Sequence, residues 1–129
     1  MNIPNNLKYT DDHEWVSVDG DIATVGITDF AQSELGELVY VEVDSFDELI
    51  DKGDVFGTVE AVKTTSELFM PVSGSVIEFN KEINEDEGDN PAIINEDPYE
   101  KGWIVKIKMS DPAELEALLD AEAYKEIIA

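Results

Sequence analysis

One lysine stands at a polar break between two segments that can form strands. Residues 59–62 lead up to Lys63, residues 68–70 follow it, and Pro71 and Gly74 punctuate the exit. This arrangement predicts a β-hairpin with Lys63 at its tip. A primary amine held on such a rigid support can be acylated by an enzyme that recognises the hairpin. The local pattern alone more often indicates a solubilising residue, because lysine side chains are mostly exposed.

The strand that leads to the lysine has two chemically different faces. Side chains alternate along a strand, so Glu60 and Val62 should share one face, with Val59 and Ala61 on the other. Glu60, three residues before Lys63, would then present a carboxylate beside the tip.

The residues needed for independent catalysis are missing. His13 is the only imidazole, the sequence contains no Cys, and neither Ser66 nor Ser73 stands at a spacing that supports pairing with His13. Residues 53–57 lack the Lys and Ser or Thr of a phosphate-binding loop. We therefore predict no enzyme activity for the chain itself. His13, close to Trp15, is interpreted as a packing or hydrogen-bonding residue at a sheet edge.

Composition limits the class of partner. The 129 residues, 43% of them apolar, predict one domain spanning residues 1–129 with a single core. The 31 acidic and 8 basic residues give a net charge of −23, which repels phosphate backbones and anionic lipids. We therefore expect no nucleic acid and no membrane partner. The charge suits docking onto basic patches, and solubility explains it equally well.

The first residues carry no recognisable targeting signal. Residues 1–6 have neither the basic and apolar regions of a signal peptide nor the arginines of a transit peptide. We expect a cytoplasmic protein, or a mature mitochondrial matrix protein if the source is eukaryotic.

Short strand-forming segments dominate the chain. Residues 15–18 and 22–27 flank an Asp19-Gly20 turn and predict a hairpin. Further strands are expected at residues 38–43, 55–59, 75–79 and 103–109. Gly74 is expected to occupy a backbone conformation that is closed to β-branched residues. Many short strands at close spacing predict a mainly β sandwich or barrel.

Three short helices complete the predicted elements. Thr28 can cap a helix that ends before Gly36. Asp111, with Pro112 after it and Glu114 at the position of a capping box, predicts the start of a C-terminal helix, and Asp120 predicts the start of a second. The side chains expected to pack inward from the C-terminal helices are Leu115, Leu118, Leu119, Tyr124, Ile127 and Ile128.

Residues 80–91 form an acidic, glycine-containing segment with oxygen donors at Glu85, Asp86, Glu87 and Asp89. Such a segment is typical of a mobile, solvated loop. Its oxygen donors do not have the spacing of an EF-hand, so we predict no metal site.

Beyond the hairpin, the sequence resembles the glycine cleavage system H protein family from about Leu7 to Ile128. The segments that carry the resemblance are His13-Glu14-Trp15, residues 25–32, residues 35–42, the hairpin at residues 58–74, residues 95–99, Gly102-Trp103 and residues 111–115. The acidic segment is longer than its family counterpart, and Ala61 stands where the family often has Ser. The ordered series of blocks is far more specific than any one of them.

The resemblance implies a lipoyl/biotinyl-type barrel-sandwich hybrid with short capping helices and C-terminal helices. It implies lipoic acid in amide linkage to Lys63, with Glu60 as a recognition residue for lipoylation. It also implies that Glu14 and Glu67 contact the lipoyl arm in a cleft, with Phe30 as an apolar wall.

The function implied by the family is that of a non-catalytic carrier. The lipoyl arm would take an aminomethyl group from glycine decarboxylase (the P protein) to the aminomethyltransferase (the T protein), and electrons to dihydrolipoyl dehydrogenase (the L protein). A lipoylating enzyme is the fourth implied partner.

Related carrier families differ from this chain at the tip of the hairpin. Biotin carriers share the fold but place Met on both sides of the lysine, where this chain has Val62 and Thr64. Lipoyl domains of 2-oxo acid dehydrogenases usually carry Asp-Lys-Ala. Two alternatives remain open, namely an H-like paralogue that relays lipoyl groups to other proteins or serves a redox-modification pathway, and an interaction domain with an unmodified lysine.

Overall fold

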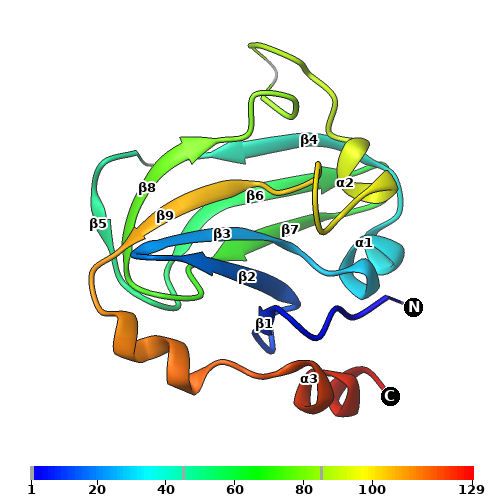
Figure 1. The fold of residues 1–129 in the computed structure, drawn as a ribbon. Coiled ribbons are helices and arrows are strands. Elements are labelled where there is room, and N and C mark those ends of the chain that lie inside the picture. Colours follow the sequence, from blue (N-terminus) through cyan, green and yellow to red (C-terminus); the bar gives the residue numbers. More distant parts are fainter. Residues whose placement is uncertain (1, 45, 85) are drawn as a thin grey trace.

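Two antiparallel sheets face each other in a computed structural model that describes residues 2–44, 46–84 and 86–129 (Figure 1). The larger sheet has the order β1 (Lys8–Tyr9), β2 (Glu14–Asp19), β3 (Ile22–Ile27), β9 (Val105–Met109), β8 (Gly74–Phe79) and β5 (Leu49–Ile50). The smaller sheet has the order β4 (Leu38–Val43), β6 (Val55–Ala61) and β7 (Thr65–Phe69). This arrangement confirms the expected mainly β sandwich.

The core lies between the two sheets. Val59 and Leu68 of the smaller sheet and Val76 and Ile107 of the larger sheet are all at most 2% exposed and belong to one apolar cluster. Strand β9 shows the expected alternation, because Ile107 is buried while Lys108 points to solvent. The side-chain period of two therefore predicted this strand correctly.

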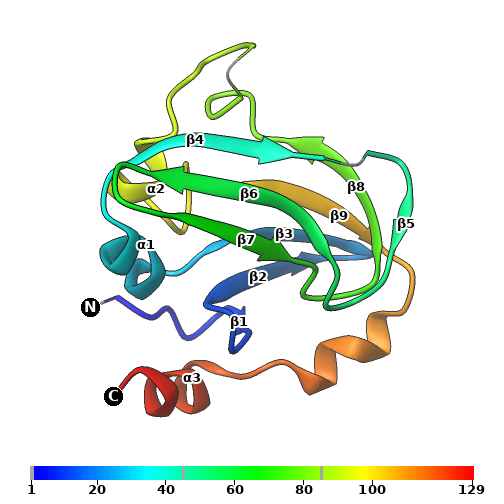
Figure 2. The ribbon, with the colours of Figure 1, turned by 180° about the vertical axis from the view of Figure 1, so that it is seen from behind.

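Helix α1 (Asp29–Leu35) begins and ends as the sequence indicated. The Thr28 side chain accepts a hydrogen bond from the Ala31 N–H, and Gly36 ends the helix with a φ of 81°. A short helix, α2 (Ile93–Glu96), packs beside α1 at the same end of the sandwich (Figures 1 and 2). These two helices flank the end of the sandwich at which β6 turns into β7.

The C-terminal region differs from expectation. The segment after Asp111 is a 3₁₀ helix, η1 (Pro112–Ala117), and the Asp111 side chain makes no capping hydrogen bond. Glu114 does not form a capping box either, because its carboxylate accepts hydrogen bonds from the Ser73 N–H and hydroxyl at 2.6 and 2.9 Å. A bidentate contact to a distant turn thus replaces the local cap.

Helix α3 (Ala121–Ile128) is the second C-terminal helix, and Asp120 caps it as predicted by accepting from the Ala123 N–H. Tyr124 is fully buried, whereas Ile127 is 47% exposed. The expectation that Ile127 packs inward is therefore wrong. Helix α3 and the N-terminal segment share a second apolar cluster below the larger sheet, made of Ile3, Leu7, Tyr9, Trp15, Ala121 and Tyr124.

Gly74 is required for a different reason than the one expected. Positive φ occurs at Gly20, Gly36 and Gly53 among the described glycines, and Gly74 is not one of them. A Cβ atom at Gly74 would lie 2.2 Å from the carbonyl oxygen of Lys108 on β9. The close approach of two backbones, and not a special backbone angle, excludes a side chain here.

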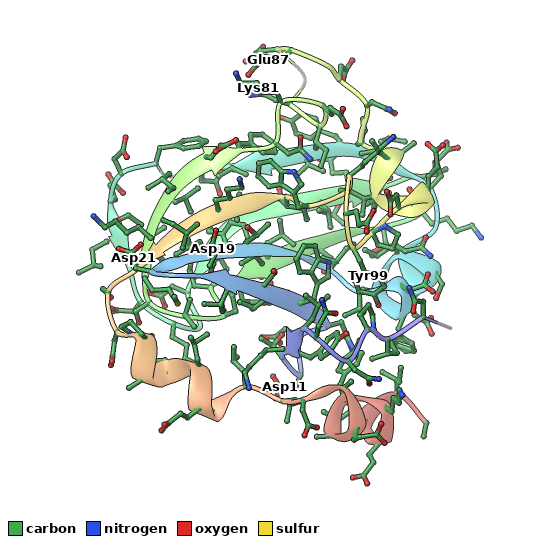
Figure 3. All side chains as sticks on the ribbon, in the orientation of Figure 1. Asp11, Asp19, Asp21, Lys81, Glu87 and Tyr99 are labelled. Atoms are coloured by element: carbon green, nitrogen blue, oxygen red, sulfur yellow. The ribbon has the colours of Figure 1, made fainter. Side chains whose placement is uncertain are left out.

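Glu85 of the acidic segment lies outside the described residues, and backbone hydrogen bonds tie together the parts on either side of it. The Gly88 N–H donates to the Lys81 carbonyl at 2.9 Å, and the Asn90 N–H donates to the Glu82 carbonyl at 2.8 Å. Ile83 is buried, which anchors the base of the loop. Figure 3 shows Lys81 and Glu87 on this protruding loop.

Two absences apply to the described residues only. No group of three or more His, Cys, Asp or Glu side chains lies close enough together to hold a metal ion. No helix in the described part of the chain has the length and apolar character needed to cross a membrane.

Candidate functional site

The β6–β7 hairpin presents Lys63 at its tip. Strand β6 ends at Ala61 and β7 begins at Thr65, and the Ala61 N–H donates to the Thr64 carbonyl at 2.7 Å. The Val62 N–H donates to the Glu37 carbonyl at 3.1 Å, which ties the turn to the start of β4. Lys63 itself is exposed. The tip is therefore supported by backbone hydrogen bonds within the hairpin and across the sheet.

The two faces of β6 are divided as the alternation predicted. Val59 and Ala61 are buried in the core, while Glu60 is exposed and Val62 is 69% exposed. Glu60 stands opposite Thr65 of β7 in the sheet register. The Glu60 carboxylate is thus accessible on the outer face beside the turn.

A cleft of about 270 Å³ lies beside the hairpin, where β7 meets helix α1 and the start of β2. Figure 2 shows these elements from the side of the smaller sheet. The cleft is lined by Asp12, His13, Glu14, Ile27, Phe30, Ala31, Glu34, Leu35, Val59, Ser66, Glu67 and Leu68. Three of these, residues 66–68, lie on β7 three to five residues after Lys63, so the strand that leaves the tip leads along the cleft.

Glu14 is the buried carboxylate of this cleft. It is 2% exposed, and its Oε2 atom accepts the Phe69 N–H of β7 at 2.9 Å. Its Oε1 atom lies 3.5 Å from the Thr10 hydroxyl. Burial raises the Glu14 pKa from 4.5 to about 8, and the hydrogen bond from Phe69 opposes that change only in part. Glu14 is therefore largely protonated at neutral pH while no cation faces it.

Glu67 reaches the same cleft from another element. It lies on β7, four residues after Lys63, opposite Thr58 in the register, and its side chain is exposed. The structure thus brings Glu14 and Glu67 to one cleft, with one carboxyl group buried and the other at the solvent side. The remaining charged lining residues, Asp12 and Glu34, are acidic too. The field in the cleft favours a cationic occupant.

Helix α1 supplies half of the apolar residues that line the cleft. Phe30 lines it, as expected, with its ring centroid 5.0 Å from the His13 ring. His13 makes a hydrogen-bond contact from Nδ1 to the Tyr124 hydroxyl at 2.9 Å, which confirms its reading as a hydrogen-bonding residue. Thr10 and Tyr124 were not anticipated as neighbours of the cleft. Tyr124 lies 111 residues away along the chain, and no local pattern signals such a contact.

The chain matches a protein-family model and solved structures of known proteins. The family model described as "Glycine cleavage H-protein" matches residues 7–129. The fold is similar to the crystal structure of a glycine cleavage system H protein from Mycobacterium marinum, with a TM-score of 0.84 and 37% sequence identity. That alignment covers 96% of this chain and 97% of the other.

Proposed function

This chain belongs to the glycine cleavage H-protein family, and on that premise we propose that it carries lipoate on Lys63 and shuttles an aminomethyl group between the enzymes of glycine cleavage. Proteins of this family carry lipoate on a lysine and are carrier subunits without catalysis of their own. The proposal also covers delivery of electrons to dihydrolipoyl dehydrogenase.

The observation that carries the proposal is the placement of Lys63. Lys63 is exposed on a turn held by the hydrogen bonds of Ala61 and Val62, and the strand that follows the turn lines a cleft with a buried carboxyl group. Among the described residues, Lys63 has no ion-pair partner. These features fit an amine that is acylated and whose attached arm has a place to rest.

A lipoyl group attached to Lys63 would supply a disulfide, of which one sulfur can take up a one-carbon unit while the other becomes a thiol. The chain's own residues protect the amine of that cargo. Glu14 and Glu67 face it with carboxyl oxygens, and Phe30 together with Leu35 reduces the access of water. A cationic amine beside Glu14 would lower the pKa of its carboxyl group, because the amine stabilises the ionised form. Glu14 would then release its proton to solvent.

The proposed partners are glycine decarboxylase, the aminomethyltransferase, dihydrolipoyl dehydrogenase and a lipoylating enzyme. Family membership supports a carrier that must dock with each of them in turn. The net charge of −23 suits partner surfaces with basic patches. The site of glycine cleavage, the cytoplasm or the mitochondrial matrix, is the proposed location.

Reconstitution tests this function. The chain, lipoylated by a lipoate ligase, is added to glycine decarboxylase, the aminomethyltransferase, dihydrolipoyl dehydrogenase, tetrahydrofolate, NAD and glycine. We expect NADH formation that depends on both glycine and the lipoylated chain. Failure of the lipoylated chain to support any NADH formation, with a known H protein active in parallel, would refute the proposal.

Glu60 is proposed as a recognition residue for the lipoylating enzyme. A Glu60→Ala chain should be lipoylated more slowly, about tenfold, because a charged hydrogen-bond partner near the reacting amine is lost. Its melting temperature should stay within about 2 °C of the parent, since an exposed carboxylate contributes little to stability. Glu42→Ala, on the neighbouring strand, is the matched control. Equal lipoylation rates for Glu60→Ala and the parent would remove Glu60 from recognition.

A further inference from the structure

We propose that Tyr124 of the C-terminal helix is a positioning residue of the arm cleft, which it serves by fixing His13 and the start of α1 through one chain of hydrogen bonds. The inference rests on the proposed function, because it assigns a role in holding the loaded arm. Helix α3 contributes no residue to the cleft lining, and through Tyr124 it becomes part of the carrier site.

The chain of hydrogen bonds has three members from three distant parts of the sequence. The Tyr124 hydroxyl lies 2.9 Å from Nδ1 of His13 and 2.7 Å from the hydroxyl oxygen of Thr28. Tyr124 and Thr28 are fully buried, and His13 lies at the wall of the cleft. The contacts therefore run from the interior outward to the cleft.

The direction of the hydrogen bonds follows from the available donors and acceptors. Thr28 already accepts from the Ala31 N–H, and the only acceptor that the described residues offer to its hydroxyl hydrogen is the Tyr124 oxygen. Thr28 therefore donates to Tyr124, which leaves the Tyr124 hydrogen for Nδ1 of His13. That nitrogen must be unprotonated, so neutral His13 carries its proton on Nε2. Nε2 is consequently a donor on the side of the ring away from Tyr124.

The same three residues hold both walls of the cleft. Thr28 caps α1, which carries Phe30, and its N–H donates to the His13 carbonyl at 3.0 Å. His13 has a φ of 66°, a left-handed conformation that non-glycine residues adopt only where their surroundings impose it. Loss of the Tyr124 hydroxyl would leave Nδ1 of His13 and the Thr28 hydroxyl without their partner. Residues 12–14 and helix α1, which line the cleft, would both be held less firmly.

A second tyrosine provides a matched control. Tyr9 stacks on Tyr124 with 4.8 Å between ring centroids and is equally buried, but its hydroxyl donates to the Pro4 carbonyl at 2.6 Å. Tyr9→Phe and Tyr124→Phe each remove one buried hydroxyl from the same ring stack. Only Tyr124→Phe removes a hydrogen bond to His13, which lines the cleft.

The test is a double-mutant cycle on the full lipoylated chain, loaded by glycine decarboxylase. We expect Tyr124→Phe to raise the rate of cargo loss about three- to tenfold, which corresponds to the net value of one hydrogen bond, and Tyr9→Phe to leave it unchanged. His13→Asn, which tolerates the left-handed conformation, should give a similar increase. The Tyr124→Phe, His13→Asn double variant should show an increase smaller than the product of the two single increases, because the two residues share one hydrogen bond. Multiplicative effects in the double variant, or equal effects of Tyr9→Phe and Tyr124→Phe, would overturn the proposal.

A second measurement requires no lipoyl group. The ¹⁵N NMR spectrum of the unmodified chain should show neutral His13 protonated at Nε2 with Nδ1 as a hydrogen-bond acceptor. The acceptor signature at Nδ1 should disappear in Tyr124→Phe and persist in Tyr9→Phe. A proton on Nδ1 in the parent chain would refute the hydrogen-bond chain, whatever the fate of Lys63. A different outcome is an intact NMR signature in a protein that a lipoate ligase cannot modify. That outcome would refute the carrier function and with it the role of Tyr124 in that function.

Discussion

A Glu14→Gln variant should be more stable than the parent chain by about 3 kcal/mol at pH 7, and this advantage should disappear near pH 4.5. The Glu14 pKa is raised to about 8 in the folded protein because the carboxyl group is buried. The folded chain therefore holds this proton more tightly than the unfolded chain. The parent must consequently lose stability as pH rises from about 4.5 towards 8, and glutamine, which never ionises, is spared that loss.

Glutamine suits the site because it keeps the oxygen that accepts the Phe69 N–H. The measurement is the free energy of unfolding in urea between pH 4.5 and 8.5. The control is Glu67→Gln, which removes an exposed carboxyl group of the same cleft. Parallel pH curves for the parent and Glu14→Gln would show that Glu14 does not hold its proton in the folded state.

The same Glu14→Gln change should shorten the life of the loaded form. A neutral amide cannot form an ion pair with the cationic amine of the cargo, so cargo loss should accelerate about tenfold. Glu67→Gln should have a smaller effect in the same direction, because its carboxylate is screened by solvent. Unchanged cargo loss in both variants would remove the two acids from the proposed role and leave the carrier function untouched.

A Lys63→Arg variant should accept no lipoyl group and support no glycine-dependent NADH formation. Arginine keeps the charge at the exposed tip but has no amine that forms the amide. The fold should be unaffected, because Lys63 is exposed and the turn is held by backbone hydrogen bonds of its neighbours. The measurements are the intact mass after incubation with a lipoate ligase and the rate in the reconstituted system.

Lys52→Arg is the matched control for Lys63→Arg. Lys52 is also exposed and also lies in a turn, between β5 and β6. The Lys52→Arg chain should accept a lipoyl group on Lys63, as the parent chain does. Residual lipoylation of Lys63→Arg would show that another lysine serves as an attachment site.

The sequence predicted the elements whose signals are local. The alternation around Val59 and Glu60, the cap at Thr28 and the cap at Asp120 depend on neighbours within one turn or strand, and all were correct. Lys63 at the tip of a hairpin was correct for the same reason.

The errors concern contacts between segments distant in the chain. Glu114, expected in a local capping box, instead accepts a hydrogen bond from Ser73. Gly74 has no room for a side chain because the carbonyl oxygen of Lys108, on another strand, lies too close. The contact of Tyr124 with His13 joins residues that are 111 positions apart. Local propensity carries no information about such partners, because they are decided by how the sheets and the C-terminal segment pack.

The most direct test of the account is to map the lipoyl group on the parent chain. The chain is incubated with a lipoate ligase, ATP and lipoate, then digested and sequenced by tandem mass spectrometry. We expect one lipoyl group per chain, on Lys63 and on none of the other seven of its eight lysines. A chain that stays unmodified while a known H protein is lipoylated in parallel, or a lipoyl group found on another lysine, would contradict the account.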